Sequence, residues 1–352
     1  MTFKKTSMAL IASALLTTTL SARDQIKIVG SSTVYPFSSS VAEEFGATTK
    51  FPTPVVESTG TGGGIKLFCA GVDLNTPDIA NASRKMKANE FKMCEENGVT
   101  DITEALIGFD GIAVAQSANV KGFNVTKTQL ALAVAEEVPS ADGKSLIKNP
   151  YKKWSDIDAS LPNREIIVYG PPKSSGTRDS FEELVMQHVF EKMPVYTDLF
   201  KADEKANKKY EKYSVVRTDG VYVESGENDN LIVQKLTKNE AALGVFGYSF
   251  LEENKDKVVG ITVDNVAPTT ETISTGKYPV ARSMYFYIKN QHISEVPALK
   301  EYANLFMSEK MIGKDGILGE LGLITLDDKT RDAARKKVMN NEKITLEDLK
   351  QH

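Results

Sequence analysis

The chain is organised around the stretch IIVYGPPKSSGTRDSFEELV, residues 166–185. The apolar run 166–169 predicts a buried strand, and 181–185 predicts an amphipathic helix. Small hydroxyl residues and a glycine, from Ser174 to Thr177, therefore lie where a helix begins. The first turn of a helix has backbone N–H groups without intrahelical partners, and together with the helix dipole they suit an anion. Arg178 adds a guanidinium that can bind two oxygens at once. The alternative is an ordinary serine N-cap followed by a surface arginine.

The same arrangement occurs three more times along the chain, which favours the anion site over the simple cap. A strand-like run at 26–29 precedes GSSTVYP at 30–36, and another at 55–57 precedes STGTGGG at 58–64. The fourth and shortest case is IANASR at 79–84. Because the loops share this pattern, we expect several of them to converge on one oxyanion.

The rest of the chain alternates strand-like and helix-like segments, which predicts an α/β fold with mostly parallel sheets. Ligands of such sheets bind beyond the carboxyl ends of the strands, and the Ser/Thr/Gly loops all lie there. Trp154, the one tryptophan, is expected to pack in a core rather than to contact a ligand. Residues 196–230 are rich in charged and amide side chains and are expected to be exposed surface, with a polar loop at 220–230.

Residues 1–22 form a secretory signal peptide by their pattern. Lys4 and Lys5 are followed by an apolar run from Met8 to Leu16, and Leu20-Ser21-Ala22 is a cleavage site. The whole chain of 352 residues has a formal charge of −4, so the loss of these two lysines leaves −6. An acidic chain without a basic stripe is a poor nucleic-acid binder, and we expect no such partner.

Cys69 and Cys94 both lie in the exported part, where an oxidising compartment favours a disulfide between them; two separate thiols are the alternative. The three histidines, His188, His292 and His352, show no metal-ligand spacing. We therefore expect neither a metal site nor a cofactor.

Five segments in order give the chain a family resemblance: GSSTVYPF, STGTGGGIKLF, DIANASR, WSDIDASLPN and SSGTRDSF. After a signal peptide, this series resembles the periplasmic phosphate-binding protein of bacterial phosphate ABC transporters. ALGVFGYSF and TGKYPVARSMYFYIK are similar to later segments of that family. The resemblance implies a type II periplasmic-binding-protein fold, with two α/β lobes, two hinge crossings near Ala115 and Met284, and phosphate between the lobes. The lobes would comprise residues 23–115 with 282–352, and 116–281.

The resemblance and the loop pattern together give the expected phosphate-binding residues. In chain order these are Ser32, Thr33, Val34 (through its backbone N–H), Thr61, Ser83, Arg84, Ser175, Gly176, Thr177 and Arg178.

The chain departs from the family pattern at two of its charged positions. Arg84 stands where the family has the aspartate that accepts the proton of hydrogen phosphate and so rejects sulfate. Pro171 stands where the family has an arginine. Arg84 and Arg178 are candidates to replace that charge, and the candidates for the acceptor are Glu57, Asp179 and Asp219.

The resemblance implies a monomeric, non-catalytic periplasmic receptor that binds inorganic phosphate and delivers it to the membrane permease of an ABC transporter. A receptor for another oxyanion, such as sulfate, phosphonate or molybdate, is one alternative. A secreted serine-dependent hydrolase or phosphatase is another, but Gly-X-Ser-X-Gly is absent around Ser175 and no histidine is placed by a motif to act as its base.

Overall fold

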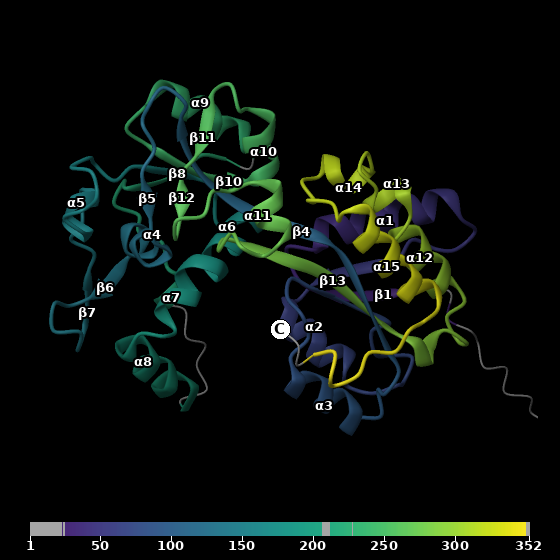
Figure 1. Cartoon of the computed structure of the whole chain (residues 1–352). Helices are drawn as coiled ribbons and strands as arrows, with labels where there is room; N and C mark the ends of the chain where they lie inside the picture. The colour runs from purple at the N-terminus through teal and green to yellow at the C-terminus, as the bar shows by residue number, and fades with distance from the viewer. Residues whose placement is uncertain (1–22, 24, 206–211, 227, 350–352) are drawn as a thin grey trace, which may run out of the picture.

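The computed structural model describes residues 23, 25–205, 212–226 and 228–349, so the expected signal peptide lies outside the described residues. Figure 1 shows the α/β architecture as two groups of helices and strands, with the long strands β4 (Ile102–Ser117) and β13 (Ala281–Lys289) running between them. The purple amino-terminal and yellow carboxyl-terminal elements share one lobe, and the teal and green middle of the chain forms the other. This is the two-lobed α/β fold that the family resemblance implies.

The first lobe starts with three strand–helix units and closes with carboxyl-terminal helices. Its amino-terminal elements are β1 (Lys27–Gly30), α1 (Tyr35–Thr48), β2 (Val55–Ser58), α2 (Thr61–Phe68), β3 (Ile79–Ala82) and α3 (Ala88–Glu96). Its carboxyl-terminal helices are α12 (Ala298–Phe306), α13 (Glu309–Ile312), α14 (Ile317–Glu320) and α15 (Asp328–Met339). β1 pairs in parallel with β2 and with β3, so the loops after these strands meet at one edge of the sheet.

The second lobe contains the stretch from which the sequence analysis began. Its strands are β5 (Asn124–Val125), β6 (Glu137–Pro139), β7 (Leu146–Lys148), β8 (Val168–Gly170), β9 (Tyr222–Glu224), β10 (Leu243–Gly247), β11 (Val258–Gly260) and β12 (Thr262–Val263). Its helices are α4 (Lys127–Val134), α5 (Trp154–Ile157), α6 (Gly176–Phe181), α7 (His188–Phe190), α8 (Pro194–Lys205), α9 (Asn230–Lys238), α10 (Tyr248–Glu253) and α11 (Thr270–Ser274). A π-helical turn, Glu182–Gln187, joins α6 to α7.

A single continuous sheet runs through both lobes, in the order β2-β1-β3-β13-β4-β10-β8-β9. β4 pairs antiparallel with β13 through residues 102–111 and then with β10 through residues 112–115. The pairing register shifts opposite Met284 and Tyr285, next to Gly108, which has φ +157°. A glycine at this φ permits the bulge in β4.

Each lobe has its own hydrophobic core. One large core consists of buried residues between Ile112 and Val280 together with Ile324, and another lies between α1, β13 and α12. Trp154 is fully buried and packs edge-on against Phe123 with 5.5 Å between ring centroids, which confirms its expected packing role.

The expectation that residues 196–230 are all exposed is wrong: β9 pairs with β8, and Val216, Val221 and Tyr222 are buried. The sequence did not predict this short strand, because its few apolar residues stand within a long polar stretch.

Cys69 and Cys94 form a disulfide, as the sequence analysis expects. It connects the end of α2 to α3, so it fixes the helix whose first residue is Thr61.

We predict that the variant with both Cys69→Ala and Cys94→Ala loses about 3 kcal/mol of unfolding free energy, because the 25-residue separation sets the unfolded-chain entropy that the bond removes. Urea denaturation of the oxidised wild type and the variant measures this difference. Adding a reductant to the variant is the control and should change nothing. Equal stability of the two oxidised proteins would show that the bond contributes nothing.

Candidate functional site

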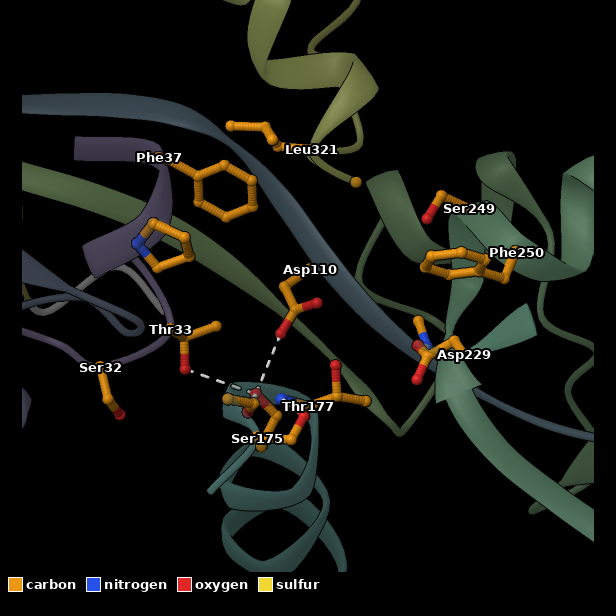
Figure 2. Close-up of a pocket in the computed structure, with 15 residues that line it drawn as sticks. Ser32, Thr33, Phe37, Asp110, Ser175, Thr177, Asp229, Ser249, Phe250 and Leu321 are labelled. Atoms are coloured by element: carbon orange, nitrogen blue, oxygen red, sulfur yellow. Dashed lines mark hydrogen bonds between the residues drawn. The ribbon is translucent and has the colours of Figure 1, made fainter. Parts of the chain in front are cut away.

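A pocket of about 170 Å³ lies between the lobes, and we call it the hydroxyl pocket. The first lobe contributes residues from the start of α1 and from the segment after α14, and the second contributes the start of α6 and residues near β10. Figure 2 shows Thr33, Asp110, Ser175 and Thr177 facing the same space. The complete lining is Ser32, Thr33, Pro36, Phe37, Asp110, Ser175, Gly176, Thr177, Ser180, Asp229, Gly247, Ser249, Phe250, Leu321 and Gly322.

The first loop is positioned by close backbone packing. A Cβ atom on Gly64 would lie 2.3 Å from the Cα atom of Gly30, so α2 can approach the end of β1 only because residue 64 is a glycine. The chain then turns into α1, where the hydroxyl of Ser31 accepts a hydrogen bond from the Val34 N–H at 3.3 Å. Ser32 and Thr33 line the pocket, whereas Val34 is fully buried and its N–H already has this partner.

The third loop forms the N-terminus of α6. Ser175 is the N-cap, and its hydroxyl accepts a hydrogen bond from the Thr177 N–H at 3.2 Å. Ser175, Gly176 and Thr177 all line the pocket. The expected first and third loops therefore do converge, and each brings a helix N-terminus to the pocket.

Arg282 of β13 connects the two loops. Its guanidinium donates to the hydroxyls of Thr33 and Ser180, and so bridges the first lobe to the second. It also donates to Glu183 at 2.6 Å, while its Nε atom lies 3.6 Å from Asp110 Oδ2. The side chain is only 6% exposed. A cation thus lies directly beside the pocket, supplied by a crossing strand and not by a loop.

The lining also includes the carboxylates of Asp110 and Asp229. Asp110, on β4, accepts a hydrogen bond from the Ser180 hydroxyl at 3.2 Å. Asp229 accepts one from the Gly247 N–H at 3.0 Å. These acceptors line the same pocket as Thr33 and Thr177, whereas the side chain of Ser32 points away from Asp110 (Figure 2).

The carboxylates that the sequence analysis considered as proton acceptors lie elsewhere. Glu57 is exposed on β2, and Asp219 is bonded to Arg217 and Lys152. The hydrogen bond from Arg217 is the main reason that the pKa of Asp219 lies well below its usual range. Asp179 is nearer, because its carboxylate interacts with Ser32, but desolvation raises its pKa. None of the three lines the hydroxyl pocket.

Arg178 points away from the pocket and into the second lobe. Its Nε donates to Glu182 at 2.6 Å, and its guanidinium lies over the ring of Tyr222 at 4.4 Å. It also donates to the Pro171 carbonyl at 3.3 Å. Successive side chains of a helix point about 100° apart, so Thr177 can face the cleft while Arg178 points into the second lobe.

The second and fourth loops lie in a neighbouring part of the cleft. The Thr61 hydroxyl lies 3.1 Å from that of Ser83 and also accepts a hydrogen bond from the Ser83 N–H. Arg84 binds both carboxylate oxygens of Glu90, at 2.8 and 2.7 Å. Ser83 and Arg84 line a second pocket, which Arg282 also lines. The structure thus divides the expected single site into two parts, with Arg282 between them.

Arg282 and Asp110 are not among the site residues expected from the sequence. Arg282 lies in TGKYPVARSMYFYIK, which enters those expectations only through the family resemblance, and Asp110 lies in the apolar run LIGFDGIAV. A charged residue inside an apolar strand is the one signal that could have identified them, because a buried charge needs a partner.

Comparison with known proteins now identifies the family. The model of the PBP superfamily domain matches residues 17–310. The chain belongs to this superfamily. Among its relatives, the protein SphX of Synechococcus elongatus is 30% identical over 323 residues, covering 90% of this chain and 82% of SphX. The phosphate-binding protein PstS of Staphylococcus epidermidis is 30% identical over 289 residues, covering 80% of this chain and 74% of PstS.

Solved structures of the superfamily agree with the fold. A possible phosphate binding protein from Planctomyces limnophilus is 26% identical, with a TM-score of 0.71, and the match covers 91% of this chain and 99% of that one. PstS from Borrelia burgdorferi, at 19% identity and a TM-score of 0.58, shares the fold. The resemblance to the phosphate-binding family seen in the sequence is confirmed.

We predict that Arg178→Met lowers the unfolding free energy by about 3 kcal/mol, because Glu182 is left partly buried without its cation. Urea denaturation measures the loss. In the matched double variant Arg178→Met/Glu182→Gln most of the stability should return, since no unpaired charge remains. A single variant as stable as the wild type would mean that this ion pair does not stabilise the lobe.

Proposed function

We propose that the chain is the extracytoplasmic receptor of a phosphate ABC transporter. It binds inorganic phosphate in the hydroxyl pocket and delivers it to the membrane permease. Relatives named phosphate-binding protein PstS, aligned over most of both chains, support this assignment. These relatives are named as binding proteins and not as enzymes, so the function is recognition without catalysis.

One observation carries the proposal: the first and third loops line a single pocket between the lobes, with Arg282 beside it. The hydroxyls of Thr33, Ser175 and Thr177, and the first-turn N–H groups of α6, are the donors. Hydrogen bonds to a charged group contribute about 1.5–3 kcal/mol each. Several of them offset the desolvation of phosphate and leave about −8 kcal/mol, which corresponds to micromolar affinity.

Arg282 and Asp110 take the places of the charged residues that the family pattern has and this chain lacks. Arg282 supplies the cation absent at Pro171, because it donates to Thr33 and Ser180, which both line the hydroxyl pocket, whereas Arg84 lines the second pocket and Arg178 lines neither. Asp110 supplies an acceptor for the proton of hydrogen phosphate. Sulfate has no such proton at neutral pH, so the same carboxylate would repel it.

The cellular location and the oligomeric state follow from the proposed function. Residues 1–22 are the signal peptide that directs the chain to the periplasm, and residues 23–115 with 282–352 and residues 116–281 are the lobes that close on phosphate as a monomer. No helix in the part of the chain that the structure describes is long and apolar enough to cross a membrane.

A receptor for sulfate or a phosphonate on this fold is the second candidate, and the hydroxyl donors alone would suit it. The carboxylates of Asp110 and Asp229 in the pocket favour a protonated ligand instead. A serine-dependent hydrolase has less support, because the Ser175 hydroxyl already accepts the Thr177 N–H and caps α6.

We predict that Thr177→Ala and Arg282→Met each weaken phosphate binding by more than tenfold, because each removes a donor to the anion. Titration calorimetry on residues 23–352, freed of ligand by partial unfolding and dialysis, measures the affinity.

The matched controls are Thr128→Ala, at an exposed position on α4, and Arg178→Met. Both should retain the wild-type affinity within about threefold, because neither residue lines the pocket and Arg178, unlike Arg282, bonds to residues outside its lining. Normal affinity in Thr177→Ala and Arg282→Met would exclude this pocket as the phosphate site.

A further inference from the structure

A second pocket of about 440 Å³ lies in the cleft, on the other side of Arg282 from the hydroxyl pocket, and we call it the basic pocket. Both lobes form its walls. The first contributes Ser83, Arg84 and Lys87, the second contributes Lys127 and the segment 183–191, and the start of β13 contributes Arg282. The space is more than twice that of the hydroxyl pocket, at about 170 Å³, so it suits a ligand larger than phosphate.

The basic pocket has more positive than negative groups, although the chain as a whole has a charge of −4. Its cations are Arg84, Lys87, Lys127 and Arg282, and its carboxylates are Glu183 and Glu191. Arg84 is paired with Glu90, and Arg282 with Glu183. Among the described residues, the ammonium groups of Lys87 and Lys127 have no ion-pair partner, and they stand on opposite lobes. An anion between them would be attracted from both sides.

The contacts of His188 also place it among positive charges. It lies on the pocket wall, and its ring is 2.8 Å from the ammonium of Lys192. Desolvation, followed by the charges of Lys127 and Lys192, lowers the pKa of His188, and only Asp264 opposes this. The pKa of Lys127 is lowered as well, by burial and then by Lys192, against the attraction of Asp264. Burial is the largest cause of both shifts, and repulsion between the neighbouring cations adds to it.

We propose that the basic pocket binds a condensed phosphate, of which inorganic pyrophosphate is the smallest, separately from phosphate in the hydroxyl pocket. Two linked phosphoryl groups place negative charge at both ends of the ligand, which matches ammonium groups on the two opposing walls. The Ser83 side chain lies on the same wall as Lys87 and would serve as a further donor. A ligand held in this way connects the lobes and favours the closed cleft.

The experiment adds pyrophosphate to residues 23–352 already saturated with isotopically labelled phosphate. We expect heat of binding by calorimetry without release of the label. Lys87→Gln and Lys127→Gln should each weaken pyrophosphate binding by about fivefold to tenfold and leave phosphate affinity unchanged. The control Lys144→Gln makes the same charge change at an exposed position in the β6–β7 turn and should have no effect.

NMR of the histidine rings provides a second readout, with His188→Gln to assign the signal. The pKa of His188 should rise when pyrophosphate is bound, because the anion offsets the neighbouring lysines. Release of the label, absence of binding, or equal affinity in all three lysine variants would overturn the proposal. Absence of phosphate binding with pyrophosphate still bound would instead contradict the proposed function and leave this inference standing.

Discussion

The contacts of Arg282 are the interaction on which the rest of the cleft depends. One guanidinium donates to Thr33 in the first lobe and to Ser180 in the second, while Glu183 and Asp110 neutralise it. A buried arginine needs partners for its charge, and these contacts hold the loop before α1 and the last turn of α6 around it. Because it projects from a crossing strand, its position depends on the β4–β13 register, which ties the site to the central pairing of the sheet.

The sequence was informative where the chemistry is local. Strand, small hydroxyl residue and helix recur at each loop, and the structure brings Ser32 and Thr33 together with Ser175, Gly176 and Thr177. The sequence did not predict features that depend on the direction of a side chain or on the pairing of strands far apart in the chain. Arg178 was selected because it is adjacent to the loop, but the helical turn points it at Tyr222. Arg282 is about a hundred residues from that loop, and only the register of β13 reveals its proximity.

The acidic character of the chain limits how it can hold an anion. Donors must come from dipoles, hydroxyls and a few cations whose charge is partly balanced nearby. The structure separates these elements within one cleft. Hydroxyls and acceptor carboxylates gather in the hydroxyl pocket, and lysines without ion-pair partners among the described residues lie in the basic pocket. Arg282 stands at the boundary between the pockets and contributes to both. This arrangement fits a chain that has an arginine in place of the family's aspartate at position 84 and a proline in place of its arginine at position 171.

The central claim is that the crossing strands supply the charge and the proton acceptor for phosphate. It is tested most directly by titration calorimetry of phosphate against sulfate at neutral pH, in the wild type and in Asp110→Asn. The account predicts that the wild type binds phosphate and ignores sulfate, and that Asp110→Asn binds sulfate as well, because the repelling carboxylate has become a donor. Equal binding of both anions by the wild type, or unchanged discrimination in Asp110→Asn, would contradict it.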